Sequence, residues 1–230
     1  MKRKVFAIVM AAFLVAVLPL LALVRPVKSL GEKGKPVFDT WNVCRTSDAA
    51  PDGYLKFSST GFEPVITVES LGENASIAYK LGQEIAEDYP NIYQRAEKVF
   101  DYVRDIVQYT PDIDQFGRKE FAQSADEMAT TVEEKGLAYG DCEDYAIFLT
   151  VMYKGAGCRS AIVLVKTETG GHVAALVYLP GYSKANRFLT VNGETGWVWA
   201  EATCRTNDFG WMPESLMDDN VKLLLTREVK

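Results

Sequence analysis

The strongest hydrophobic pattern in the sequence is a long apolar run near the N-terminus, from Val5 to Val24. Twenty helical residues extend about 30 Å, which is the thickness of the hydrocarbon core of a bilayer. Three basic residues at positions 2–4 precede the run, and basic flanks of this kind favour a cytoplasmic N-terminus. The pattern therefore predicts a transmembrane anchor at residues 5–24, preceded by a cytoplasmic basic tip at residues 1–4.

A cleaved secretion signal is the alternative interpretation of the same run. Such a signal usually has a shorter apolar region, followed by a small-residue cleavage site of the Ala-x-Ala type. Residues 24–28 are Val-Arg-Pro-Val-Lys, which favours the uncleaved anchor. With either interpretation the body of the protein lies outside the cytoplasm, where disulfide bonds can form.

The remaining chain divides into an entry segment and one domain. Residues 25–60 are rich in Gly, Pro, Ser and Lys, a composition typical of a stalk and an irregular entry segment. Residues 61–230 are predicted to form a single domain with its core at about residues 91–203. A short strand is expected near the start of this domain, at residues 65–69.

Apolar residues at three- and four-residue steps predict helices in the first half of the domain. The expected helices run from Ala75 to Glu87 with Asn74 as the N-cap, from Asn91 to about Tyr109, and from Ala125 onward after a polar loop at residues 111–124. These helices precede a fourth one that carries the chemistry described below.

The fourth helix is expected to follow Asp141, a residue type that commonly caps helix N-termini. Its apolar positions share one face and are Tyr145, Phe148, Leu149, Met152 and Tyr153. Glycines at positions 155 and 157 end it. The spacing predicts one buried face, and it places Cys142 in the first helical turn.

Beyond Gly157 the pattern changes to strands. Apolar runs predict strands at residues 161–166, 172–179, 188–191 and 197–202, with turns between them. Helices followed by consecutive antiparallel strands are typical of the α+β class. The sequence therefore predicts one α+β domain.

Charge and composition narrow the function classes. The chain of 230 residues has a net charge of −6, and because residues 1–28 carry +5, the exported body carries −11. An acidic surface argues against nucleic acid as a partner. There are four cysteines, none in a Cys-x-x-Cys pair, and a single histidine, His172. A structural zinc site is therefore poorly supported.

Any imidazole chemistry must use His172, and Cys142 is well placed to work with it. A helix N-terminus lowers the pKa of a thiol through its partial positive charge and its free amides. A thiolate nucleophile also needs a base, and the base needs a third group that fixes its tautomer. Glu201 follows His172 by 29 residues on a later expected strand, and adjacent antiparallel strands can bring two such side chains together.

Each of these residues alone also has an ordinary structural explanation. Cys142 suits a small buried position, His172 a structural position in a strand, and Glu201 a solvated strand position. A cysteine that opens a helix, combined with a histidine that opens a strand, favours catalysis. We therefore predict Cys142 as the nucleophile, His172 as the base and Glu201 as the orienting acid.

The same residues resemble the transglutaminase-like superfamily. The resemblance rests mainly on three motifs, which are Gly140-Asp141-Cys142-Glu143-Asp144-Tyr145-Ala146, Gly171-His172-Val173-Ala174 and Trp197-x-x-x-Glu201-x-Thr203. Gly157 and two upstream segments, Val103–Tyr109 and Ala125–Met128, are also similar to the family. It implies a papain-like α+β fold, with a helical N-terminal half packed on an antiparallel sheet, and a Cys–His–acid triad. The family more often has Asp at the position of Glu201. It also supplies an oxyanion donor upstream, and the sequence assigns none beyond the Cys142 amide.

The resemblance implies an exported cysteine protease or amidase that acts on a protein or peptide substrate through a thioester. If an amine rather than water resolves the thioester, the protein is instead a crosslinking acyltransferase. A non-catalytic binding or scaffolding ectodomain, with the four cysteines in two disulfide bonds, is the rival from another class. The state of Cys142 separates the two classes, because a catalytic thiol must be free.

Three acidic residues, Asp141, Glu143 and Asp144, surround the expected nucleophile. Carboxylates in the first turn of a helix commonly interact with its dipole, and the resemblance requires no cofactor. The Asp-Cys-Glu run nevertheless resembles one that is associated with calcium in bacterial transglutaminase-like cysteine proteinases, and calcium prefers clustered carboxylates. Calcium near Asp141 and Glu143 is therefore a hypothesis to test against the structure.

The remaining cysteines allow at most one disulfide bond if Cys142 is free. Cys204 closely follows Glu201, so a bridge at Cys204 would brace the site. We predict Cys44–Cys204 over Cys158–Cys204, and either bridge requires Cα atoms roughly 4.4–6.8 Å apart.

Overall fold

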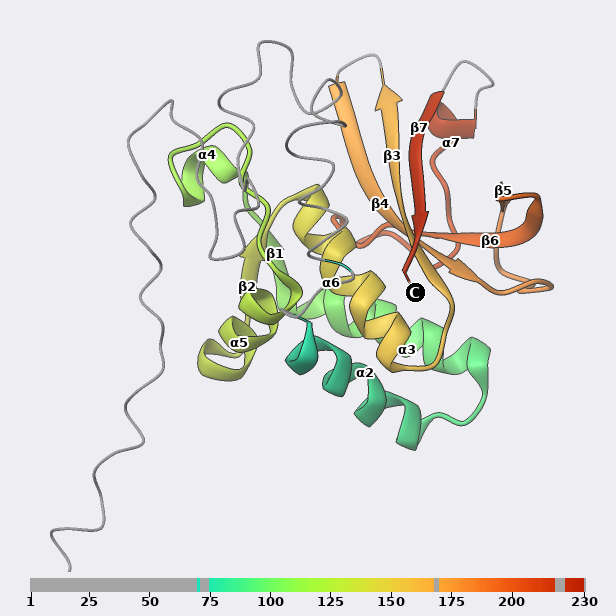
Figure 1. Cartoon of the computed structure of the whole chain (residues 1–230), viewed down its shortest axis with the longest axis horizontal. Coiled ribbons are helices and arrows are strands. Elements are labelled where there is room, and N and C mark those ends of the chain that lie inside the picture. The colour runs from blue at the N-terminus through green and yellow to red at the C-terminus, as the bar shows by residue number, and fades with distance from the viewer. Residues whose placement is uncertain (1–69, 71–74, 168–169, 218–221, 230) are drawn as a thin grey trace, which may run out of the picture. The chain divides into compact units, whose positions relative to one another are not determined.

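The computed structural model describes residue 70 and residues 75–167, 170–217 and 222–229. These residues form a helical half followed by an antiparallel sheet (Figure 1), which is the α+β arrangement that the sequence predicted. The helices are α2 (Ser76–Asp88), α3 (Ile92–Ile106), α4 (Asp112–Gln115), α5 (Ala125–Lys135), α6 (Cys142–Gly155) and α7 (Glu214–Met217). The strands are β1 (Val107–Tyr109), β2 (Ala138–Gly140), β3 (Ser160–Thr167), β4 (Gly170–Tyr178), β5 (Phe188–Val191), β6 (Glu194–Ala200) and β7 (Lys222–Glu228).

The main sheet has five strands in the order β5-β6-β4-β3-β7, and every neighbouring pair is antiparallel. Both faces of this sheet are apolar. On β3, Ile162 and Leu164 belong to the core shared with the helices, whereas Ala161, Val163 and Val165 belong to a second cluster with Trp197 and Trp199. This alternation is the period of two that a strand imposes on its side chains.

Helix α6 lies in the centre of the described part, with α2, α3 and α5 on one side and β3 and β4 on the other (Figure 1). Every residue from Glu143 to Tyr153 is buried. The prediction of one buried face was therefore too narrow. An amphipathic stripe marks the first packing face of a helix, and a central helix buries the opposite face as well.

The backbones of α2 and α6 touch at two glycines. A Cβ atom added to Gly82 would lie 2.0 Å from the Met152 carbonyl oxygen, and one added to Gly155 would lie 2.0 Å from the Tyr79 carbonyl oxygen. No side chain fits at either position. The two helices are therefore packed backbone to backbone, while β3 and β4 cover α6 from the other side.

The start of α2 differs from the prediction. Its N-cap position is Ala75, which makes no side-chain cap, and Asn74 lies outside the described residues. The carboxylate of Asp126, in α5, instead accepts hydrogen bonds from the amides of Ile77 and Ala78 at 2.8 and 3.0 Å. A tertiary contact thus satisfies amides that a local cap usually satisfies.

The segment after α3 is the largest correction to the predicted elements. The helix was expected to reach Tyr109, but it ends at Ile106, and β1 begins at the next residue. Strand β1 pairs in parallel with β2, from Val107 opposite Ala138 to Tyr109 opposite Gly140. Helix α4 occupies part of the polar loop expected at residues 111–124. Three-residue strands and a one-turn helix are too short for a periodic pattern to reveal.

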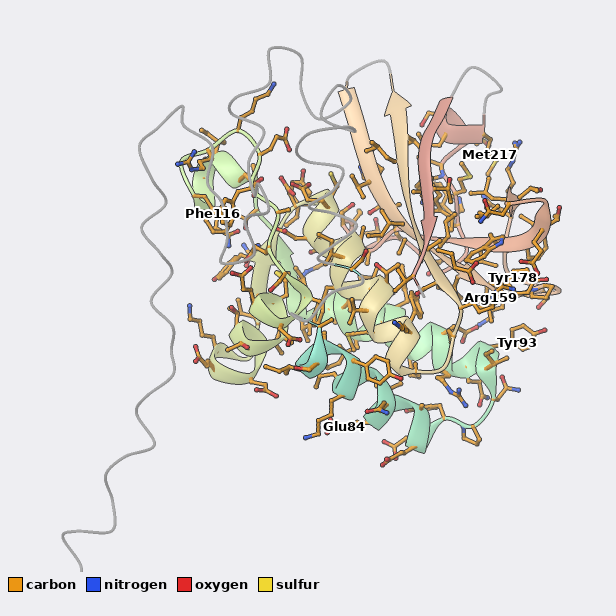
Figure 2. All side chains as sticks on the ribbon, in the orientation of Figure 1. Glu84, Tyr93, Phe116, Arg159, Tyr178 and Met217 are labelled. Carbon is orange, nitrogen blue, oxygen red and sulfur yellow. The ribbon has the colours of Figure 1, made fainter. Side chains whose placement is uncertain are left out.

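The strands after Gly157 match the prediction closely, with shifted ends. Strand β4 starts at Gly170, so His172 is its third residue rather than its first, and β6 ends at Ala200, so Glu201 directly follows the strand. Strand β7 was not predicted. Figure 2 shows Arg159, the residue before β3, beside Tyr178, the last residue of β4; Arg159 pairs with Glu194 of β6 and Glu228 of β7, both at 2.7 Å.

Several sequence predictions concern residues outside the described part, namely the basic tip, the anchor at 5–24, the stalk at 25–60 and the strand at 65–69. Among the described residues, no helix combines the length and the apolar character needed to span a membrane.

Candidate active site

Cys142 is the first residue of α6, where the helix meets the start of β4. Strand β2 and Asp141 lead into it, and the side chain is partly buried. The thiol donates a hydrogen bond to Glu143 Oε2 at 3.3 Å, and it lies close enough to the His172 side chain and the Val173 backbone for both to lower its pKa. A cysteine at a helix N-terminus, beside an imidazole, has the surroundings of a nucleophile.

His172 connects Cys142 to Glu201. Its Nε2 atom contacts Glu201 Oε2, which leaves Nδ1 for the thiol. The other carboxylate oxygen of Glu201 accepts from the amide and the hydroxyl of Thr203 at 3.0 and 2.6 Å. The structure therefore brings together the three side chains that the sequence singled out, in the order thiol, imidazole, carboxylate.

The pKa values of the pair reflect burial and mutual contact. Burial, assisted by the negative charge of Asp141, raises the pKa of the Cys142 thiol, and the hydrogen bond from His172 opposes this effect. Burial alone would lower the pKa of His172, but the hydrogen bonds with Cys142 and Glu201 outweigh it and raise the pKa to about 10. His172 is therefore held in the form that stabilises a negative charge on sulfur.

A cluster of four carboxylates lies on the other side of Cys142. Oxygen atoms of Asp112, Glu120, Asp141 and Glu143 all lie within 4.8 Å of one another. Asp112, Asp141 and Glu143 are buried, and each has one buried carboxylate oxygen without a hydrogen-bond partner in the described part of the chain. Burial, together with the charge of Asp141, raises the pKa of Asp112 to about 10 and raises that of Glu143.

The carboxylate cluster has the composition of a site for a hard cation. Calcium takes six to eight oxygen ligands, mostly from carboxylates and carbonyls, and buried carboxylates without partners are costly unless a proton or a cation joins them. Two of the four residues, Asp141 and Glu143, belong to the sequence-based calcium hypothesis. Asp112 and Glu120 were missed because they lie on the loop that contains α4, outside any local motif.

The model of the transglutaminase-like superfamily matches residues 79–214. This chain belongs to the transglutaminase-like superfamily. Two solved structures are also similar to it. A candidate cysteine protease from Cytophaga hutchinsonii has a TM-score of 0.38 and 13% identity, over 84% of this chain and 59% of the other. A candidate protease from Parabacteroides distasonis has a TM-score of 0.34 and 16% identity, over 56% of this chain and 26% of the other.

This transglutaminase-like chain thus spans less than two thirds of the length of either solved protein. Among curated proteins, none matches the sequence.

Asp144, the third acidic residue near the nucleophile, has a different environment in this transglutaminase-like domain. It is fully buried, and its Oδ1 accepts from the Gln123 amide at 2.8 Å while its Oδ2 accepts from Gln123 Nε2 at 2.6 Å. Burial raises its pKa to about 8 against the opposing effect of these hydrogen bonds. Asp144 therefore joins α6 to the segment before α5 and takes no part in the carboxylate cluster.

The cysteines of the transglutaminase-like domain correct the predicted bridges. Cys142, Cys158 and Cys204 all carry free thiols. Because Cys204 is free, neither Cys44–Cys204 nor Cys158–Cys204 is formed, and Cys44 itself lies outside the described residues. A free Cys142 is what the enzyme hypothesis requires, and it argues against a structural disulfide at this position.

Proposed function

We propose that this chain is a thiol-dependent hydrolase of amide or peptide bonds, with Cys142 as nucleophile, His172 as base and Glu201 as orienting acid. The observation that supports it best is the continuous contact from the Cys142 thiol through His172 to Glu201, at the N-terminus of a buried helix. Membership of the transglutaminase-like superfamily agrees with acyl chemistry at a thiol.

The proposed reaction has two halves. In the first, the proton of the thiol is held on His172, the Cys142 sulfur bonds to the substrate carbonyl carbon, and the C–N bond breaks as this proton passes to the leaving amine. In the second, His172 takes a proton from water, the hydroxyl oxygen bonds to the thioester carbon, and the C–S bond breaks to restore the thiol and release a carboxylic acid. An amine in place of water would make the product a new amide.

Glu201 suits the orienting role although the family more often has Asp there. One of its oxygens contacts His172 and the other is fixed by Thr203. The side chain is buried, so this carboxylate is held in one orientation. A carboxylate fixed against Nε2 keeps the imidazole in the tautomer that presents Nδ1 to sulfur.

The proposal includes a calcium ion at the carboxylate cluster. Asp112, Glu120, Asp141 and Glu143 would hold it, because their oxygens converge and three buried ones have no partner in the part of the chain that the structure describes. When bound, the ion supplies positive charge that offsets the mutual repulsion of the four carboxylates.

Calorimetry tests the calcium site directly. We expect one calcium to bind the full chain, with binding lost or at least tenfold weaker in Asp112→Asn. Asp114→Asn is the matched control, because Asp114 lies in the same helix but is exposed. Equal calcium affinity of all three proteins, or no binding to any of them, would rule the site out.

The location of the enzyme is also part of the proposal. Residues 5–24 anchor the chain with the N-terminus in the cytoplasm and the transglutaminase-like domain outside it, as the apolar run and the basic residues before it favour. The mass of the protein isolated from membranes tests this statement. An intact N-terminus is expected, and a chain that begins shortly after residue 24 would replace the anchor with a cleaved signal.

The function itself is tested by thiol labelling followed by mass mapping. With calcium present, an iodoacetamide probe should modify Cys142 faster than Cys204, which is more exposed, and His172→Ala should slow only the Cys142 reaction. Cys204→Ser is the matched control and should leave Cys142 labelling unchanged. Labelling of Cys142 at an ordinary thiol rate, without any effect of His172→Ala, would contradict the proposal.

The two acyl acceptors are separated by a second measurement. Incubation of the full chain with a denatured protein substrate should release new carboxyl and amino termini. If a primary amine is incorporated into glutamine side chains instead, without chain cleavage, the enzyme is an acyltransferase.

A further inference from the structure

The segment that follows β6 contains an asparagine that contacts the proposed triad acid. Glu201 is the first residue after the strand, and the pairing of β6 with β4 ends one residue earlier, at Ala200 opposite Ala175. Sheet pairing therefore stops one residue short of the acid. The side-chain amide of Asn207 donates from Nδ2 to the carbonyl oxygen of Glu201 at 3.1 Å, and it thus holds the backbone of the acid just beyond the end of the sheet.

Asn207 is itself held firmly in the fold. Its backbone amide donates to the Cys204 carbonyl at 3.0 Å, which closes the turn that returns the chain toward β6. Two residues later Phe209 is buried, and its ring centroid lies 5.6 Å from that of Phe100 in α3. The next amide, of Gly210, donates to a carbonyl of β6 at 3.1 Å. The turn is therefore tied both to the helical half and to the sheet, so Asn207 can act as a fixed point.

A glutamate needs more fixing than an aspartate in an orienting role. Its side chain has one more rotatable bond, and each bond that must be held in one rotamer costs conformational entropy. Thr203 holds one carboxylate oxygen of Glu201 with its amide and its hydroxyl, and the other oxygen contacts His172. These contacts fix the carboxylate end of the side chain, whereas the contact with Asn207 fixes its backbone end.

We propose that Asn207 is a positioning residue for catalysis, which acts through Glu201 by holding its backbone so that the carboxylate stays against His172. The inference rests on the proposed function, because it assigns a residue to the same triad. An acid that shifts orients the imidazole less well, and small errors in the placement of catalytic groups lower the rate. Sequence analysis gave Asn207 no role, since it follows the last predicted strand on an irregular segment.

Asn207→Ala in the full chain, with calcium present, removes the donor at a partly buried position. We expect kcat for cleavage of a peptide substrate to fall about tenfold with KM little changed. Asn186→Ala is the matched control and should keep the wild-type kcat. Asn186 braces the same segment by donating to the Met212 carbonyl and accepting from the Met212 amide, both at 2.9 Å, and it has no printed contact with the triad acid.

A double-mutant cycle separates positioning from a general structural effect. In Glu201→Ala there is no carboxylate to position, so adding Asn207→Ala should lower kcat no further. If Asn207→Ala does not fold, Asn207→Asp, which keeps the shape but has no amide donor, takes its place in the same cycle.

Three results would overturn the inference and leave the proposed function intact. They are a wild-type kcat in Asn207→Ala, an equal loss of kcat in Asn186→Ala, and a further tenfold loss when Asn207→Ala is added to Glu201→Ala. Absence of cleavage by the wild type would instead overturn the proposed function, and the inference with it.

Discussion

Two groups of polar side chains flank Cys142, and they differ in how completely their atoms are paired. Toward the sheet, His172 and both oxygens of Glu201 have partners. Toward β2 and α4, three buried oxygens of the carboxylate cluster have no hydrogen-bond partner among the described residues. A polar network that is satisfied holds its members in one arrangement, whereas a partly satisfied one is costly until something joins it. The hydrogen bonds on the sheet side are therefore satisfied within the protein, whereas a proton or a cation would stabilise the carboxylate cluster.

The largest effect on activity is expected from substitutions of Cys142 and His172. His172→Gln should lower kcat for peptide cleavage on the order of 10⁴-fold or more, because removal of the base from a catalytic triad removes its function as a unit. Cys142→Ser should be equally inactive, and the double variant should be no worse than either single one. Rates from single-turnover cleavage check this expectation. A double variant far worse than both would show that the two residues act separately.

Glu201→Gln should have a smaller effect on the same side. We expect kcat to fall about 100-fold, because the amide keeps a hydrogen bond with the imidazole but loses the charge that stabilises its protonated form. Glu201→Asp, which keeps the charge, is the control and should recover part of the activity. Equal loss in both variants would assign the effect to geometry alone.

The same substitution should change the pH dependence of stability. The folded state raises the pKa of His172 from 6.5 to about 10, so protonated His172 stabilises the fold fully below pH 6.5, and this contribution is lost as the pH rises through about 10. The difference in unfolding free energy between wild type and Glu201→Gln should therefore be greatest below pH 6.5 and shrink toward pH 10. Denaturant titrations across this range measure it, and a difference that grows with pH would contradict the assignment.

Calcium binding at the carboxylate cluster is expected to stabilise the fold. Calcium at 100 times its dissociation constant should stabilise the fold by about 2.7 kcal/mol, provided the unfolded chain does not bind it. Asp112→Asn should abolish this gain, and without calcium it should melt no lower than the wild type, because a pKa of about 10 already keeps Asp112 uncharged at neutral pH. Melting curves with calcium and with chelator check both statements. A calcium-induced shift that survives in Asp112→Asn would place the ion elsewhere.

The two sides also differ in how far the sequence predicted them. Cys142, His172 and Glu201 were identified because each stands at the end of a long periodic element, where a helix or strand boundary can be located from the pattern. Asp112 and Glu120 have no such boundary, since they lie on a loop whose path depends on α4 and on the pairing of β1 with β2. They approach Asp141 only in the folded chain, so the local sequence does not reveal the cluster.

The predicted elements were wrong where they depend on contacts between distant parts of the chain. The short strands β1 and β2 and the helix α4 have three or four residues each, too few for a period, so the chain around Tyr109 was assigned to the preceding helix. The full burial of α6 depends on Gly82 and Gly155, whose lack of a side chain signals nothing until α2 is placed against it. Both errors arise where contacts between elements override the local pattern.

The smallest effect concerns Asp144, a buried acid next to the carboxylate cluster in sequence whose oxygens have hydrogen-bond partners of their own. Gln123→Leu removes the side-chain donor at 2.6 Å and keeps the backbone amide, so one buried carboxylate oxygen loses a partner and stability should fall by about 1–3 kcal/mol. Gln108→Leu, an exposed position on β1, is the control and should change stability by less than about 0.5 kcal/mol. Urea denaturation measures both. If Gln123→Leu is as stable as the control, the Gln123 side chain does not stabilise Asp144. The hydrogen bonds of Asp144 would then not distinguish it from the acids of the carboxylate cluster.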